Sequence, residues 1–144
     1  MCLIYLVRVK RINAICWAEG VKNTILISIH LNAAGDGSKW LDATGWSCYT
    51  CKGETASDRL ANCLYNAAQR ILKDQVVHTD YARDGDPDWE ELRHSLCPAV
   101  LTENYFMDGL DLDFLQSRAG KQAIIDTHVE GIIEYLHVRQ HSDC

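Results

Sequence analysis

The stretch Ile27-Ser28-Ile29-His30-Leu31-Asn32-Ala33 decides the fold, because an apolar run rich in β-branched residues (25–29) ends abruptly on a histidine. This pattern predicts a buried strand that carries an imidazole to the edge of a sheet. The pattern returns in Pro98-Ala99-Val100-Leu101-Thr102-Glu103-Asn104, where a short apolar run ends on one ionisable side chain. In open α/β sheets, ligands bind beyond the carboxyl ends of the strands. If the two strands are parallel and adjacent, His30 and Glu103 share one site.

Length and composition favour a single globular domain that spans residues 1–144. A chain of 144 residues can bury one core without a linker. The 20 acidic residues outnumber the 14 basic ones, which gives a net charge of -6, and the bases form no block that could neutralise a row of phosphates. Nucleic acid is therefore excluded as the expected partner. The odd set of seven cysteines, scattered among apolar runs, favours synthesis in a reducing cytoplasm.

We expect neither a signal peptide nor a membrane anchor in the first residues. Met1-Cys2-Leu3-Ile4-Tyr5-Leu6-Val7 is apolar, but no basic segment precedes it and Arg8 interrupts it early. The run also has the composition of a strand remnant, which suggests that further sequence precedes it.

Hydrophobic periodicity predicts strands that alternate with helices, and so an α/β domain with helices packed on the sheet. Helices are expected at 8–17 and at 117–136, and a short helical turn at 112–115. A further helix is expected to begin at a capping box formed by Thr55 and Asp58 and to end at residue 71. Strands are expected at 21–30, at 45–51 and before Glu103. Loops are expected at 32–39, 76–91 and 104–112, and a frayed tail at 137–144.

The residue types at the two strand ends suit metal-assisted hydrolysis. A neutral imidazole such as that of His30 is a common zinc ligand, and zinc lowers the pKa of a bound water to roughly 7. A carboxylate beside that water, as Glu103 would be, can act as general base and then protonate a leaving amine. The structural alternative is that His30 caps a strand with a satisfied hydrogen bond while Glu103 pairs with a nearby base such as Arg93.

The two segments together resemble the signatures of zinc-dependent N-acetylmuramoyl-L-alanine amidases. The segments are Ser28-Ile29-His30-Leu31-Asn32-Ala33 and Pro98-Ala99-Val100-Leu101-Thr102-Glu103-Asn104-Tyr105-Phe106. The similarity extends over nearly all of residues 8–136, with further matches at Arg8 and Asn13, Asp113-Phe114-Leu115, Gly120-Lys121 and 129–136.

The resemblance implies a fold, a reaction and roles for three residues. The fold is an α/β domain with a central, mostly parallel sheet, and the reaction is hydrolysis of the amide between N-acetylmuramic acid and L-alanine in peptidoglycan or muropeptides. His30 matches a zinc ligand, Glu103 the catalytic carboxylate, and Asn32 an asparagine that orients ligand or substrate. Leu92 and Arg93 match a less specific pair for which a structural role is expected. The site of action implied is the cell wall.

The chain departs from this family at its beginning. The family starts with a strand that ends in a Gly-His-Gly-Gly type motif and a helix that carries a glutamate, and these supply two of its three zinc ligands. Neither is present here, so one strand and one helix are expected to be missing, and the sheet edge they leave exposed could mediate self-association. The alternative function is a catalytically inactive remnant that folds, or binds wall fragments, without hydrolysis.

Other candidate site residues have ordinary structural explanations. The residues that might replace the missing ligands are better explained as surface or core positions, and these are His78, His94, His128, Glu19 and Glu54. Cys48 and Cys51 have the spacing of a thiol redox pair, a second rival function, but on a strand they would face opposite sides. Trp40, Trp46 and Trp89 could line a glycan groove, although core packing explains Trp46 equally well.

Overall fold

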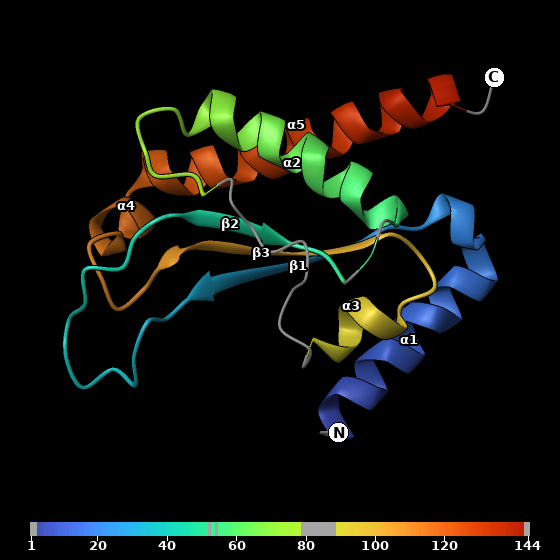
Figure 1. The fold of residues 1–144 in the computed structure, drawn as a ribbon, viewed down its shortest axis with the longest axis horizontal. Coiled ribbons are helices and arrows are strands. Elements are labelled where there is room, and N and C mark those ends of the chain that lie inside the picture. Colours follow the sequence, from blue (N-terminus) through green and yellow to red (C-terminus); the bar gives the residue numbers. More distant parts are fainter. Residues whose placement is uncertain (1–2, 52, 54, 79–88, 143–144) are drawn as a thin grey trace.

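The computed structural model describes residues 3–51, 53, 55–78 and 89–142, and shows a small sheet with helices on both sides (Figure 1). Its helices are α1 (Leu3–Glu19), a 3-10 turn η1 (Val21–Asn23), α2 (Ala56–Ile71), α3 (Glu90–His94), α4 (Leu112–Gln116) and α5 (Arg118–Ser142). Its strands are β1 (Leu26–Asn32), β2 (Trp46–Tyr49) and β3 (Ala99–Phe106). In Figure 1, α2 and α5 lie together above the sheet, and α1 and α3 lie on the other side. The predicted α/β fold is therefore confirmed.

The sheet brings the two expected strands together. The strand order is β1-β3-β2, with β1 parallel to β3 and β2 antiparallel to it. His30 and Glu103 are register partners near the carboxyl ends of the parallel pair. β1 is an edge strand of this sheet, and its Ile29 and Leu31 are exposed. Self-association through this edge stays a prediction.

The parallel pairing shifts register just beyond His30. The shift lies between His30 and Asn32, and Asn32 then pairs with Phe106. Opposite this point Tyr105 has a φ of 69°, in the left-handed region that side chains with a Cβ rarely adopt. Its ring is fully buried and packs edge-on against Phe114, which holds the strained backbone in place. The irregularity therefore falls directly after the two site residues.

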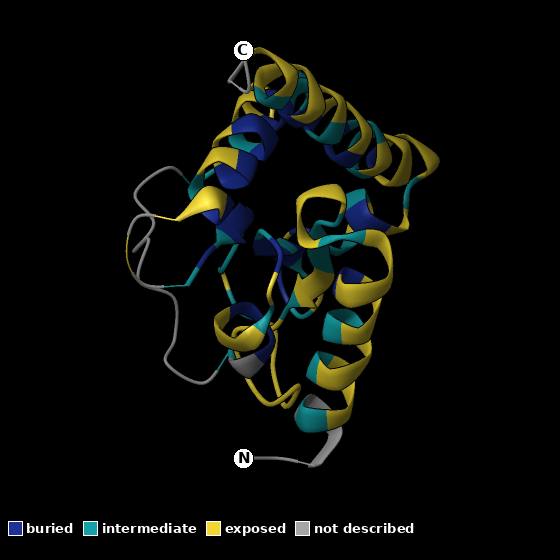
Figure 2. Cartoon of the chain, turned by 90° about the vertical axis from the view of Figure 1, so that its right-hand side faces the viewer, coloured by how far each residue is buried: buried dark blue, intermediate teal, exposed yellow. Residues whose placement is uncertain are grey.

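The main core lies between the sheet and the helix pair α2 and α5. The buried side chains in it include Trp46, Leu60, Leu64, Val100, Tyr105 and Tyr135. Figure 2 shows these helices with buried inner faces and exposed outer faces. α2 begins with the predicted capping box: the backbone N–H of Thr55 donates to Asp58 Oδ2 at 2.6 Å, and the N–H of Ser57 donates to Thr55 Oγ1 at 3.2 Å. Gly131 lets α5 approach α2 closely, because a Cβ there would lie 2.7 Å from Leu64 Cδ2.

Several predicted boundaries are wrong. The apolar start of the chain is helical from Leu3, not a strand remnant, and the later helix continues through the predicted tail as far as Ser142. Basic Arg139 and His141 in the last turn favour that extension through the helix dipole. Val21–Asn23 form a 3-10 turn before β1, and the predicted loop after Glu103 starts only beyond Phe106.

Parts of two predicted segments lie outside the described residues. Residues 79–88 of the predicted 76–91 loop lie outside the described residues, as do 143–144 of the tail. Within the described part of the chain, no helix is both long and apolar enough to cross a membrane.

Candidate active site

His30 and Glu103 face each other across the parallel strand pair. His30 Nδ1 lies 3.9 Å from Glu103 Oε1, and the His30 side chain is 42% exposed whereas that of Glu103 is only 13% exposed. Parallel pairing in register places both residues on the same face of the sheet, which explains the approach. The predicted meeting of these two residues is confirmed.

Burial sets the acidity of the Glu103 carboxyl. Desolvation raises the pKa of Glu103 above its ordinary value, and the charge of His30 opposes this effect. Glu103 Oε2 is buried and accepts no hydrogen bond from the residues described in the structure. No ion pair joins Glu103 to Arg93, although both residues are described, so the Glu103 half of that structural alternative is not supported. A carboxylate with a raised pKa and a free lone pair is suited to accepting a proton.

A second carboxylate, Glu91, approaches the other side of the imidazole. Its side chain comes from α3 and is buried, and its Oε1 lies 4.0 Å from His30 Nε2. Ser28 lies between them: its Oγ is 2.7 Å from Glu91 Oε1 and 2.9 Å from His30 Nε2. Arg8 Nη1 from α1 lies 3.6 Å from Glu91 Oε2. Side chains from α1, α3 and β1 therefore form one connected network that reaches His30.

Sequence reasoning missed Glu91 and the supporting residue Asn104. Glu91 sits beside Leu92 and Arg93, but a helix of five residues is too short for its buried face to be identified by periodicity. Asn104 is buried and its Nδ2 donates to the backbone oxygen of His30 at 2.9 Å. Its Oδ1 accepts from Trp46 Nε1 at 2.9 Å, so the amide fixes the backbone of His30 to the core. Its position one residue after Glu103 was the available signal.

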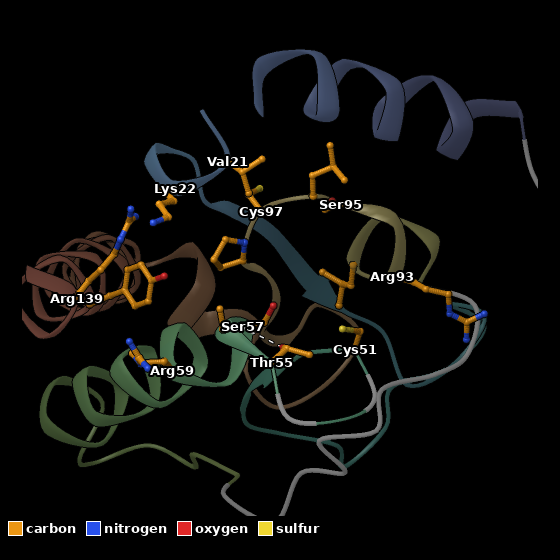
Figure 3. A pocket seen from close by; sticks show the side chains of 15 residues that line it. Val21, Lys22, Cys51, Thr55, Ser57, Arg59, Arg93, Ser95, Cys97 and Arg139 are labelled. Atoms are coloured by element: carbon orange, nitrogen blue, oxygen red, sulfur yellow. Dashed lines mark hydrogen bonds between the residues drawn. The ribbon is translucent and has the colours of Figure 1, made fainter. Parts of the chain in front are cut away.

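Asn32 lies near the His30–Glu103 pair, whereas Arg93 lies away from it. Asn32 ends β1 beyond the register shift, and its Oδ1 accepts from the N–H of Ala33 at 2.9 Å. Arg93 is exposed and lines a cavity of about 500 Å³ near Pro98, at the opposite end of β3 (Figure 3). Neither His30 nor Glu103 lines that cavity. We place the candidate site at the His30–Glu103 pair, because the ionisable groups converge there.

The described residues do not complete a zinc site. The donor types suit zinc, because His30 Nδ1 lies 3.9 Å from Glu103 Oε1 and the other carboxylate oxygen, Oε2, has no hydrogen-bond partner among the described residues. However, a catalytic zinc takes three protein ligands, and no group of three His, Cys, Asp or Glu side chains in the described part of the chain is placed to hold a metal.

The other sequence candidates have structural explanations. His78 bonds the backbone oxygen of Thr44 at 2.8 Å, and His128 is buried with both ring nitrogens hydrogen-bonded. His94 and Glu19 are exposed, and Glu54 lies outside the described residues.

The thiol and tryptophan hypotheses receive little support. Burial raises the pKa of the Cys48 thiol well above its ordinary value, whereas a redox pair needs a depressed one. Trp46 is fully buried in the core, Trp40 is exposed, and Trp89 packs edge-on against Tyr49. A shared glycan groove built from the three tryptophans is therefore not seen.

Comparison with known proteins identifies the family. Residues 7–134 match the sequence profile of the family described as N-acetylmuramoyl-L-alanine amidase, so the chain belongs to that family. The chain is 28% identical over 129 residues to the endolysin of Bacillus phage SPP1, an alignment that covers 87% of this chain and 45% of that relative.

Solved amidase structures share the fold. The CwlD amidase from Clostridioides difficile, solved in complex with the GerS lipoprotein, has a TM-score of 0.69 at 21% identity, over 91% of this chain and 60% of that one. The N-acetylmuramoyl-L-alanine amidase from Clostridium difficile 630 has a TM-score of 0.66 at 23% identity, over 90% of this chain and 65% of that one. The chain therefore spans less than two thirds of each of these relatives.

Proposed function

We propose that the site hydrolyses the amide bond between N-acetylmuramic acid and L-alanine in peptidoglycan. The observation that carries the proposal is the His30–Glu103 pair at the carboxyl ends of adjacent parallel strands, in a chain of this amidase family. Peptidoglycan or a muropeptide is the proposed substrate, and the cell wall the proposed site of action.

Glu103 is the proposed general base. Its carboxylate would take a proton from a water molecule as the water oxygen forms a bond to the amide carbonyl carbon. The C–N bond would then break, and Glu103 would return the proton to the leaving amino group of L-alanine. The products are a lactyl carboxylate and a free N-terminal alanine. The raised pKa of Glu103 supports the first half of this cycle, because it makes the carboxylate a better proton acceptor.

Zinc at His30 is part of the proposal on the strength of the family resemblance. The measurement is the zinc content of the purified chain and of His30→Ala. Stoichiometric zinc that is lost in the variant would support metal binding. Absence of zinc in both proteins, even after dialysis against zinc, would count against it.

Hydrolysis is tested by incubating the full chain with purified peptidoglycan, with and without added zinc, and quantifying new N-terminal alanine. We expect release by the natural chain and a very large loss of release in Glu103→Gln. Glu130→Gln is the matched control, because Glu130 is exposed on α5 and pairs only with Arg70 among the described residues. It should keep full activity.

The competing function is a remnant that folds or binds wall fragments without cutting them. The incomplete ligand set favours this alternative, because no three His, Cys, Asp or Glu side chains among the described residues are placed to hold a metal. Sedimentation of the chain with insoluble peptidoglycan, without release of N-terminal alanine under any metal condition, would establish it and refute the amidase proposal. Asn32→Ala, which should weaken substrate affinity in the amidase, would then leave binding unchanged.

A further inference from the structure

The protons around Ser28 can be counted, and the count determines which nitrogen of His30 carries hydrogen. A serine hydroxyl has one proton to donate and two lone pairs to accept with. Ser28 Oγ has two close polar neighbours, Glu91 Oε1 at 2.7 Å and His30 Nε2 at 2.9 Å. An ionised carboxylate can only accept, so the hydroxyl proton goes to Glu91. The remaining bond requires that His30 Nε2 carry a hydrogen and donate it to Ser28.

The charge on Glu91 is what makes this count decisive. Its side chain is buried, and a buried carboxylate must be paired to stay charged. Arg8 supplies that pairing from α1, with its Nη1 3.6 Å from Glu91 Oε2. The arginine therefore acts on the histidine through the glutamate and the serine.

We propose that Arg8, Glu91 and Ser28 are positioning residues that hold neutral His30 in the tautomer with hydrogen on Nε2. The lone pair of Nδ1 is then directed at Glu103, whose Oε1 lies 3.9 Å away. The opposite tautomer would place the lone pair of Nε2 against the Ser28 oxygen, with the Glu91 carboxylate 4.0 Å away, and would leave no donor for Ser28 to accept.

The fixed tautomer deepens the proposed function. A histidine binds a metal or accepts a proton only through the nitrogen that has the lone pair, and the other nitrogen is commonly held by a neighbouring acceptor. Here the available nitrogen is the one beside the general base. The functional meaning rests on the proposed hydrolysis, whereas the tautomer itself rests on the hydrogen bonds alone.

The tautomer can be measured directly by long-range proton–nitrogen NMR of the full chain labelled with ¹⁵N-histidine, in chelator-treated buffer at a pH where the ring is neutral. The His30 signals are assigned by their loss in His30→Gln. We expect a hydrogen-bearing Nε2 and an unprotonated Nδ1. His128 is an internal reference for the opposite tautomer, because its Nδ1 lies 2.7 Å from the backbone oxygen of Ile124, which can only accept.

Two variants test the cause. Glu91→Gln should shift the tautomer ratio of His30 about tenfold toward hydrogen on Nδ1, the size expected for losing one charged acceptor. Ser28→Ala should shift it in the same direction, and Ser28→Thr, which restores the hydroxyl, should reverse the shift. Ser38→Ala is the matched control on an exposed loop serine and should change nothing. Unchanged His128 signals show that each variant is folded.

Two results would overturn the proposal. One is a natural chain in which His30 has hydrogen on Nδ1, and the other is a ratio unaffected by both Glu91→Gln and Ser28→Ala. If the natural chain also hydrolyses peptidoglycan, the two variants should lower kcat with little change in KM. If it does not, the proposed function fails while the NMR result still decides the tautomer.

Discussion

Thr102 and Glu103 are neighbours on β3, and each faces a histidine on a different side of the sheet. Thr102 Oγ1 lies 2.9 Å from Nε2 of His128 on α5, in the buried layer of the molecule. Glu103 lies against His30 on β1, where the ring is 42% exposed. Alternation along a strand separates the two environments by a single residue. A histidine therefore contributes to packing on one face of the sheet, and a second histidine is available for chemistry on the other face.

The hydrogen bonds of His128 explain why it is structural. Its Nδ1 donates to the Ile124 oxygen, so its Nε2 accepts from the Thr102 hydroxyl, and no nitrogen is left for a ligand. Burial lowers the pKa of His128, which keeps the ring neutral. His30 instead has a nitrogen directed at a carboxylate with a raised pKa. The ligand-binding capacity of a histidine is decided by what its two nitrogens already bond.

The largest expected difference between the two faces is in catalysis. Glu103→Gln should reduce the release of N-terminal alanine by about 10²–10⁴-fold, the usual contribution of a general base, while the free energy of unfolding stays nearly constant. Thr102→Val, one residue away on the packing face, should retain most of the activity per folded molecule. Initial rates on purified peptidoglycan measure both. Equal losses in the two variants would show that the faces are not functionally distinct.

Stability should show the reverse order. Thr102→Val removes the donor to His128 and an acceptor that Asn104 Nδ2 reaches at 3.2 Å, and it leaves buried polar atoms unpaired. We expect a loss of about 1–3 kcal/mol in the free energy of unfolding, measured by urea denaturation. A loss as large in Glu103→Gln would contradict the comparison, since Glu103 Oε2 has no hydrogen bond to lose among the described residues.

The buried histidine should also make the fold sensitive to acid. Because the folded pKa of His128 is lowered, the unfolded chain takes up a proton first as the pH falls below about 6.5. The stability that neutral His128 contributes is therefore complete above that pH and is lost as the pH falls toward the folded pKa. The slope should reach at most about 1.4 kcal/mol per pH unit. Urea denaturation from pH 7.5 to 5 should show this slope in the natural chain and a smaller one in His128→Gln.

The sequence predicted His30 and Glu103 but not the second carboxylate near His30, Glu91. The strand ends at His30 and Glu103 could be predicted, because an apolar run that stops on a polar side chain indicates the end of a buried strand. The second carboxylate could not be predicted from the sequence. Glu91 lies on a helix and reaches His30 through Ser28, which is 63 positions earlier in the chain. Only tertiary packing brings that helix, and Arg8 of α1, to the strand.

The boundaries that failed have a related cause. The apolar start of the chain hides a helical period, because its polar positions appear only from Arg8 onward, and Leu6, Val9, Ile12 and Cys16 then show the partly buried stripe. The end of β3 was wrongly predicted as a loop. The residue type of Tyr105 gives no indication that its backbone is left-handed. The conformation of Tyr105 is imposed by its packing in the core, and such packing cannot be predicted from local residue propensities.

The smallest expected effect is that of His30→Gln on stability. The ring is 42% exposed and has one close hydrogen bond among the described residues, to the Ser28 hydroxyl, so the free energy of unfolding should change by less than about 0.5 kcal/mol. His128→Gln, by contrast, disturbs two buried bonds. A loss above about 2 kcal/mol for His30→Gln in metal-replete buffer that disappears in chelator would mean that His30 holds a bound metal in the folded state, because a ligand bound only to the folded protein stabilises it by mass action. The same loss in both buffers would instead place His30 with His128 among the structural residues.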